Sequence, residues 1–138
     1  MALNIDLAPT LLDLAGVPAS ESMQGTSWRP LLEADASKTA NWRKSFFYEY
    51  FFENNYTQIP TVLAVRTEKA KLIKYPGHDD WTELFDLSAD PYETKNLATD
   101  PASKELLTAM QAEFDQQAKA VDFRVPEFAD KRQGEPSK

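Results

Sequence analysis

The chain has 138 residues, of which 42% are hydrophobic and 27% charged, as in an ordinary globular protein with one modest core. Fifteen basic residues against 22 acidic ones give a net charge of −7, which argues against a nucleic-acid-binding surface. The sequence has no Cys and a single His, which excludes disulfides, thiolate zinc sites, a Cys nucleophile and metal sites built from several His. No apolar run approaches the ~20 residues needed to cross a bilayer.

The first residues predict an apolar helix at positions 6–15. Asp6 is its expected N-cap, and Gly16 stands where a C′ glycine ends a helix. Almost every other position is apolar, so we expect the helix to be covered on two sides. The start of the chain has no signal-peptide pattern, and a chain that begins inside such a helix is expected to come from something larger. The residues on its main apolar face are Leu7, Leu11 and Leu14.

A loop, a short helix and a linker are predicted next. Residues 17–25 have the composition of a loop, and Ser27 is placed to cap a short helix at about 28–33. Residues 33–40 are small and polar, which is typical of a surface linker.

Four strands are predicted in the middle of the chain. The first is aromatic on both faces, which predicts a central strand covered on both sides. The second and third form a hairpin around Glu68-Lys69. Strands that follow one another without helical crossovers favour an antiparallel sheet. The predicted strands are residues 45–53, 61–67, 70–75 and 81–87.

Two acidic caps follow the strands. Asp90, Pro91 and Glu93 form the pattern of a capping box, which predicts one helical turn that ends near Asn96. Asp100 repeats the pattern and opens the clearest helix, at about 101–121. The sequence therefore predicts an α+β fold, in which a helix packs on one face of a four-stranded antiparallel sheet. The apolar stripe of the long helix is Leu106, Leu107, Met110, Phe114, Ala118 and Val121.

The segment from His78 to Trp81 is one candidate site. His78, Asp79 and Asp80 bring an imidazole next to carboxylates, but adjacent side chains rarely converge on a metal ion, so we predict no metal site. The segment is either a solvated loop or a ligand contact inside a larger protein. Trp81 is a candidate for stacking on a sugar, whereas the aromatic run at 46–52 is expected to be core.

Arg66 is the other candidate. It is either an ion-pair partner at the edge of a strand or a clamp for a carboxylate or sulfate. Lys71 and Lys74 are three residues apart, so they should point to opposite faces and form no joint anion site. Glu49 is expected to be the buried partner of Arg66 or Arg43. The sequence has no Gly-rich phosphate loop and no Ser-His-Asp set, so it predicts no complete catalytic apparatus.

An ordered series of motifs resembles the C-terminal part of type I sulfatases, the arylsulfatase and N-acetylglucosamine-6-sulfatase group of the alkaline phosphatase superfamily. The resemblance covers about residues 4–121. The motifs are 4–16 (NIDLAPTLLDLAG), 23–32 (MQGTSWRPLL), 42–43 (WR), 48–50 (YEY), 64–67 (AVRT), 71–75 (KLIKY), 83–87 (ELFDL) and 90–97 (DPYETKNL).

The resemblance implies a sulfuric ester hydrolase that acts on sulfated glycans. Its catalytic domain would carry a formylglycine, made from a C-x-P-S-R or S-x-P-S-R motif, and a calcium site. The chain contains neither motif, so it would be inactive alone and hold no cofactor itself. The parent enzyme would be exported from a bacterium. Residues 1–40 would form the junction with the N-terminal catalytic domain, 41–121 the α+β subdomain and 122–138 a tail.

In this family the subdomain closes one side of the active-site cleft and helps to select the substrate. His78, Asp79, Trp81 and Arg66 are then the candidate contacts to the sulfated carbohydrate, and no catalytic residue is expected here. Two other functions remain open: a stand-alone carbohydrate-binding or interaction module, and a purely structural domain.

The predicted helix at 6–15 would lack its cover in isolation, so we expect it to be mobile, repacked on the sheet or buried by self-association.

Overall fold

The structure is a computed structural model that describes residues 1–33, 42–53, 55–56 and 58–125. The chain forms two compact units, Met1–Lys44 and Ser45–Lys138. Most of the predicted linker at 33–40 and the predicted boundary between 40 and 41 lie outside the described residues, as do residues 126–138 of the predicted tail. The domain boundaries therefore stay predictions, and the two units are described one at a time.

The first unit contains η1 (Asn4–Asp6), α1 (Leu7–Leu14) and α2 (Arg29–Leu32). α1 ends in a Schellman motif, in which the Gly16 amide donates to the Asp13 carbonyl (3.1 Å) and the Val17 amide to the Leu12 carbonyl (2.8 Å). Gly16 has a φ of +71°, a conformation that strains residues with a Cβ. The predicted helix end at Gly16 is confirmed.

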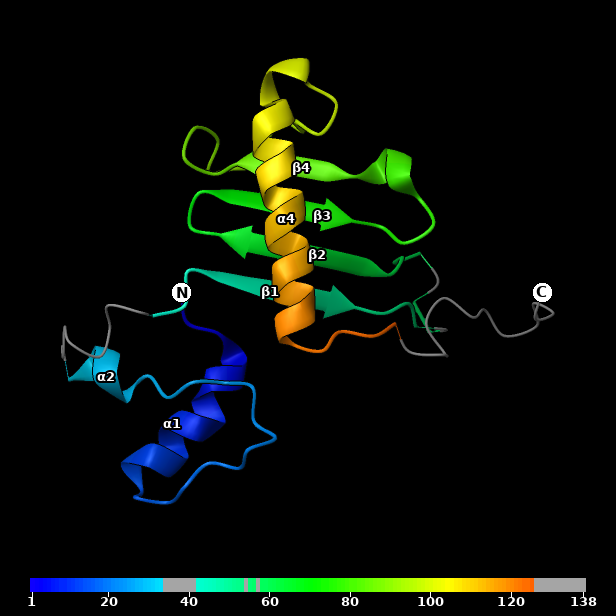
Figure 1. Ribbon diagram of the computed structural model, residues 1–138. Helices are drawn as coiled ribbons and strands as arrows, with labels where there is room; N and C mark the ends of the chain where they lie inside the picture. The colour runs from blue at the N-terminus through cyan, green and yellow to red at the C-terminus, as the bar shows by residue number, and fades with distance from the viewer. Residues whose placement is uncertain (34–41, 54, 57, 126–138) are drawn as a thin grey trace. The chain divides into compact units, whose positions relative to one another are not determined.

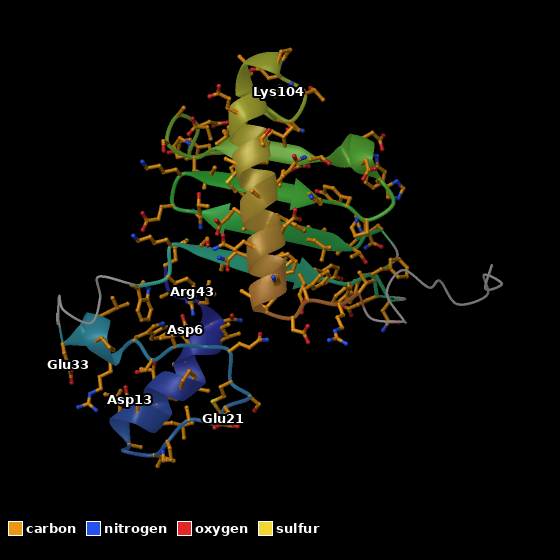
Figure 2. All side chains as sticks on the ribbon, viewed as in Figure 1. Asp6, Asp13, Glu21, Glu33, Arg43 and Lys104 are labelled. Carbon is orange, nitrogen blue, oxygen red and sulfur yellow. The ribbon has the colours of Figure 1, made fainter. Side chains whose placement is uncertain are left out.

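Asp6 holds the first unit together in a way that the sequence did not predict. It occupies the N-cap position of α1, but its side chain makes no capping bond there. Its fully buried carboxylate instead accepts hydrogen bonds from the backbone of Leu3 (2.7 Å) and Thr26 (2.8 Å) and from Trp28 Nε1 (3.2 Å). Arg43 completes the set (Figure 2), because its two terminal nitrogens donate to the two carboxylate oxygens, each at 2.7 Å.

The apolar face of α1 is largely open. Leu7, Leu11 and Leu14 keep 50%, 59% and 57% of their surface exposed. The expected lack of cover is therefore observed for these three side chains. Self-association through this face stays a prediction.

The second unit is an antiparallel sheet with a helix on one face (Figure 1). The strands pair in chain order, β1-β2-β3-β4, and α4 (Lys104–Ala120) crosses them after the short helix η3 (Pro101–Ser103). The predicted α+β class is confirmed. The strands are β1 (Ser45–Tyr50), β2 (Val62–Thr67), β3 (Ala70–Lys74) and β4 (Glu83–Asp86).

The core lies between α4 and the sheet. Val65 pairs with Leu72, which pairs with Leu84, so the three side chains share one face of the sheet, and none has exposed surface. Met110 and Phe114 of the predicted stripe pack on them from α4. Full burial of side chains of this size stabilises a fold by about 1.5–3 kcal/mol each, so this layer holds the second unit together.

Two predictions about the strands were wrong. β1 lies at the end of the sheet and pairs only with β2, and Tyr48 is 49% exposed, so β1 is not a covered central strand. The aromatic pattern misled because both faces of an edge strand can carry aromatic residues when only one packs on a helix. The strand expected from residue 81 begins at Glu83, since Trp81 belongs to the short helix η2 (Asp79–Trp81).

The turn after β4 also differs from its prediction. Asp90 accepts hydrogen bonds from the Lys95 amide (2.9 Å) and Thr94 Oγ1 (3.2 Å), but no helical turn follows it. Glu93 has a φ of +57°, which interrupts a right-handed helix. Its carboxylate forms an ion pair with Lys71 instead of reaching back to the cap. The segment is therefore a tight turn that is tied to β3.

Candidate functional site

The loop between β3 and β4 positions three of the four predicted contact residues. Gly77, with a φ of +81°, lets the chain turn back after β3, and the His78 amide donates to the Tyr75 carbonyl (2.9 Å). The Trp81 amide then donates to the His78 carbonyl (3.0 Å), which forms η2. The loop thus places His78, Asp79 and Trp81 within one turn.

Two rings of this loop stack on each other. The centroids of His78 and Trp81 are 4.0 Å apart with an angle of 9° between the planes, and Tyr75 meets Trp81 edge-on at 5.8 Å. Tyr75 is itself fixed by a hydrogen bond to Glu83 Oε1 (3.2 Å). Burial, followed by the charge of Glu83, raises the pKa of Tyr75, so the phenol stays protonated as the donor. Trp81 keeps 46% of its surface exposed and forms a fixed aromatic platform.

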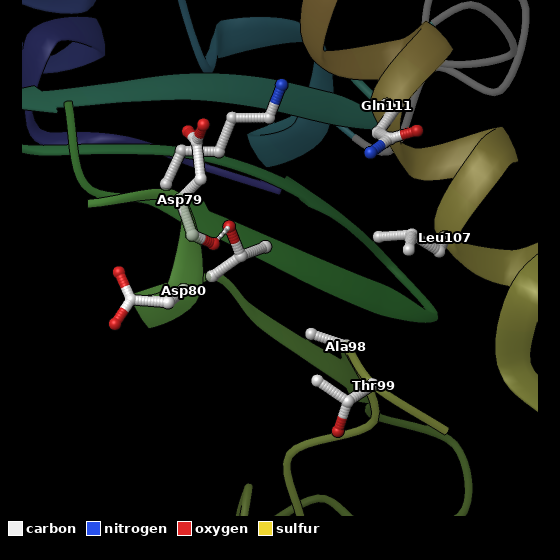
Figure 3. A pocket seen from close by; sticks show the side chains of 8 residues that line it. Asp79, Asp80, Ala98, Thr99, Leu107 and Gln111 are labelled. Carbon is white, nitrogen blue, oxygen red and sulfur yellow. Dashed lines mark hydrogen bonds between the residues drawn. The ribbon is translucent and has the colours of Figure 1, made fainter. Parts of the chain in front are cut away.

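A pocket of about 340 Å³ lies between this loop and α4. Figure 3 shows Asp79 and Asp80 on one side of it and Leu107 and Gln111, from α4, on the other. The Asp80 carboxylate points away from these two helical residues. The residues that line the pocket are Lys74, Asp79, Asp80, Thr82, Ala98, Thr99, Leu107 and Gln111.

The side-chain amide of Asn96 fixes two walls of the pocket. Asn96 Nδ2 donates to the Thr82 carbonyl (3.0 Å), and its Oδ1 accepts from the amides of Leu84 (3.0 Å) and Ala98 (2.9 Å). Thr82 Oγ1 also donates to the Asp79 carbonyl (2.8 Å), which ties η2 to the start of β4. These bonds fix the backbone of Thr82 and Ala98, which form two walls of the pocket.

Arg66 and the candidate loop lie at opposite ends of the strands. Arg66 lies on β2 beside the turn to β3, whereas the candidate loop follows the far end of β3. Its register partners are Phe46 and Lys71, on the face opposite α4. The side chain is exposed, and among the described residues it forms no ion pair. The expected ion pair at a strand edge is therefore not found, and the oxyanion clamp stays a prediction.

The remaining expectations can be placed as well. Glu49 is exposed on β1, so it is not the buried partner of a cation, and Arg43 pairs with Asp6. Lys71 and Lys74 do point to opposite faces, since Lys71 lies over Phe85 and Lys74 over Phe114 of α4.

Within the described part of the chain, no group of His, Asp and Glu is arranged to hold a metal ion, and no helix is long and apolar enough to cross a membrane.

Sequence reasoning missed most of the pocket. Ala98, Thr99, Leu107 and Gln111 join the loop only through the path of the chain from β4 to α4. Gln111 is an exposed helical residue with no motif around it. The one available signal was Asn96, a polar residue at a predicted turn whose side chain proved to bind three backbone groups.

Comparison with known proteins identifies the family. Residues 1–120 match the family described as N-sulphoglucosamine sulphohydrolase, C-terminal. The chain belongs to this family of sulfatase C-terminal domains. The resemblance inferred from the ordered motifs is confirmed, and this sulfatase domain contains the loop and the pocket described above.

Relatives are matched only over part of their length. An N-acetylglucosamine-6-O-sulfatase of Bacteroides thetaiotaomicron is 36% identical over 97 residues, which are 70% of this chain and 17% of that protein. A Δ4,5-hexuronate-2-O-sulfatase of the same organism is 36% identical over 116 residues, 81% of this chain and 22% of that protein. The chain thus spans about a fifth of these relatives.

A solved structure shows the same fold. It is the structure of BT4656 in complex with its substrate D-glucosamine-2-N,6-O-disulfate, with a TM-score of 0.76 and 30% identity. The match covers 85% of this chain and 24% of that chain. The arrangement of a sheet with one crossing helix is therefore that of the C-terminal part of a larger sulfatase.

Proposed function

We propose that this chain is the C-terminal part of a sulfuric ester hydrolase that acts on sulfated glycans. One observation carries the proposal: residues 1–120 match a family of sulfatase C-terminal domains. The chain spans about a fifth of two relatives that are named as sulfatases of N-acetylglucosamine and of a hexuronate. The partner would be an N-terminal catalytic domain that carries the formylglycine and the calcium site. Neither group has a motif in this chain, so the chain would be inactive alone.

The sheet face opposite α4 supports such a partner. Tyr48, Ala64 and Ile73 are register partners on this face, and Phe46 lies on it opposite Arg66. Tyr48 is 49% exposed, and Phe46 and Ile73 are half-buried. A sheet commonly buries both faces when helices or another domain cover it. We propose that the catalytic domain covers this aromatic face.

The open leucine face of α1 supports the same partner from the first unit. Three exposed leucines on one face of a helix are an apolar patch that favours burial. Self-association of the isolated chain is the competing outcome. Sedimentation of the purified chain tests this competing outcome. A dimer of the wild-type chain that is absent in the variant L11E would show self-association through α1.

Within the complete enzyme, the β3–β4 loop would close one side of the cleft and contribute to substrate selection. The fixed stack of His78 and Trp81 and the exposed carboxylate of Asp79 are its means of contact. Arg66 lies at the other end of the sheet, so its role as a sulfate contact would require a separate part of the substrate. A free-standing binding module is less well supported, because the matched relatives are several times longer.

The test has two arms. The purified chain should not hydrolyse an aryl sulfate with or without calcium, and measurable calcium-dependent hydrolysis would refute its inactivity alone. In the complete polypeptide, W81A and H78A should lower kcat/KM for a sulfated glycan several-fold more than for a small aryl sulfate. Tyr92, which is 87% exposed on the turn after β4, offers the matched control Y92A. Equal effects of W81A and Y92A would favour a purely structural domain.

A further inference from the structure

The pocket between η2 and α4 has the size of a site for one sugar ring. Its volume of about 340 Å³ lies at the lower end of the range of roughly 300–1,000 Å³ for small-molecule sites. Two of its walls, at Thr82 and Ala98, are held by the side chain of Asn96, so this part of the pocket is formed before a ligand binds. A preformed site loses less entropy on binding.

The polar groups around the pocket are available to a ligand. In the described part of the chain, the side chains of Asp79, Thr99 and Gln111 have no hydrogen-bond or ion-pair partner. The Lys74 ammonium group lies 4.3 Å from the centroid of the Phe114 ring and forms no ion pair there. A carboxylate, a hydroxyl, an amide and an ammonium group thus surround one space, which suits a ligand with several hydroxyls.

Part of the lining of the pocket is apolar. Ala98 and Leu107 are both half-buried and lie beside the core. The carbon–hydrogen face of a pyranose ring is apolar while its hydroxyls lie around the edge. The pocket likewise combines two apolar lining residues, Ala98 and Leu107, with polar ones.

The charges of the lining decide which sugar fits. Asp79 and Asp80 outnumber Lys74, so a sulfate group would meet a net negative surface. An ammonium group would be attracted, above all by Asp79, because the Asp80 carboxylate points away from the helical wall. An amine is therefore favoured over a sulfate.

We propose that this pocket binds an unsulfated amino-sugar residue of the glycan. The proposal rests on the proposed function for its glycan, and it assigns a second contact on the substrate beyond the sulfated residue. Asp79 would pair with the sugar amine, Gln111 and Thr99 would bind hydroxyls, and Ala98 with Leu107 would support the ring.

The test is a titration of the full chain, labelled with ¹⁵N, by NMR. Glucosamine should shift the amide signals of residues 79–82, 98–99 and 111 with a Kd in the millimolar range. N-acetylglucosamine, which lacks the charge, should bind several-fold more weakly, and glucosamine 6-sulfate no better than N-acetylglucosamine. Absence of shifts at these amides, or tightest binding by glucosamine 6-sulfate, would overturn the proposal.

Two variants test the assigned roles. D79N should remove the preference for glucosamine over N-acetylglucosamine, and Q111A should weaken both several-fold. D115N and Q116A are the matched controls, because both residues are exposed on α4 and line no part of the pocket. Equal effects of Q111A and Q116A would contradict the site.

The outcome is separable from the proposed function. If the sugars do not bind but the complete polypeptide hydrolyses glycan sulfates, only the pocket assignment fails. If glucosamine binds at the pocket but the complete polypeptide has no sulfatase activity, the pocket stands and the proposed function fails.

Discussion

Arg43 and Asp6 form a bidentate ion pair between residues 37 positions apart, with both nitrogen–oxygen distances at 2.7 Å. The Asp6 side chain has no exposed surface and that of Arg43 is 17% exposed. The pair fixes η1 to the residues that immediately precede β1 in the chain. Because Asp6 also accepts from Thr26 and Trp28, it joins three segments of the first unit.

Removal of either partner should destabilise the first unit strongly. R43A would leave a buried carboxylate without its counter-ion, and loss of one member of such a pair costs about 3–5 kcal/mol. We expect the indole N–H signals of Trp28 and Trp42 to lose their dispersion in NMR spectra of R43A, while that of Trp81 in the second unit is retained.

R29A is the matched control for R43A. Arg29 also pairs with carboxylates, Asp13 at 3.2 Å and Glu33 at 2.7 Å, but its side chain is 45% exposed. Exposed pairs contribute about 0–1 kcal/mol. If R43A and R29A change the first unit equally, the buried pair is not what holds it.

Asp6 should also make the first unit sensitive to acid. Burial raises the pKa of Asp6, but the hydrogen bonds from Arg43, Thr26, Leu3 and Trp28 outweigh it and hold the pKa well below its usual range. An unfolded Asp has a pKa of about 3.9, so unfolding takes up a proton near and below that pH. The stabilisation is then complete above about pH 4 and is lost as the pH falls toward the folded pKa.

Acid unfolding followed by the Trp28 indole signal measures this effect. The wild type should lose stability steeply between about pH 4 and strongly acidic conditions. D6N should be less stable at neutral pH and should show a smaller slope over the same range, because its amide does not titrate. An identical slope in D6N would assign the acid sensitivity to other carboxylates.

The regular elements followed from the sequence because their signals are local. Repeated apolar spacing in the long helix predicted a stripe of six residues, of which Met110 and Phe114 are buried and the other four half-buried. The strand patterns and the turn between them predicted the hairpin of β2 and β3. Gly16 ended α1 as expected, since a positive φ there is a local requirement. Such features depend on neighbours in the chain.

The polar connections were not predictable in the same way. Asp6 looked like an N-cap because its neighbours suit a helix start, but donors from Thr26, Trp28 and Arg43 determine its role. Asn96 stands where the sequence predicts the end of a helical turn, but its side chain instead bridges β4 to the following loop. Each is a single residue whose partners are set by tertiary structure, so no periodic pattern reports it.

Asn96 should contribute more to stability than its exposed position suggests. Its Oδ1 accepts a hydrogen bond from the amide of Leu84, a fully buried residue. N96A would leave that amide unpaired, at a cost of about 1–3 kcal/mol. N96D keeps the acceptor but loses the bond to the Thr82 carbonyl (3.0 Å), so it should lie between N96A and wild type.

Urea unfolding followed by Trp81 fluorescence measures the loss in the second unit. Asn55, an exposed residue between β1 and β2, provides the control N55A, which should change the free energy of unfolding little. If N96D is as unstable as N96A, the acceptor role assigned to Oδ1 is wrong. If N96A matches N55A, the bridge does not stabilise the sheet.

Gly25 should tolerate no side chain, because the loop before α2 runs directly against η1. A Cβ at this position would lie 3.0 Å from the Asp6 amide nitrogen and closer still to the Ile5 carbonyl. G25A therefore has to push apart the segment that carries Asp6, at a cost of about 1–3 kcal/mol, the range for overpacking. Where the backbone is compatible, Gly→Ala instead stabilises by about 0.4–1 kcal/mol, so the two cases differ in sign.

Q24A, at the exposed neighbouring residue, is the control. In urea unfolding followed by the Trp28 indole signal, G25A should unfold at lower urea than Q24A, whereas a stability equal to or above wild type would show that the loop can move away from Ile5.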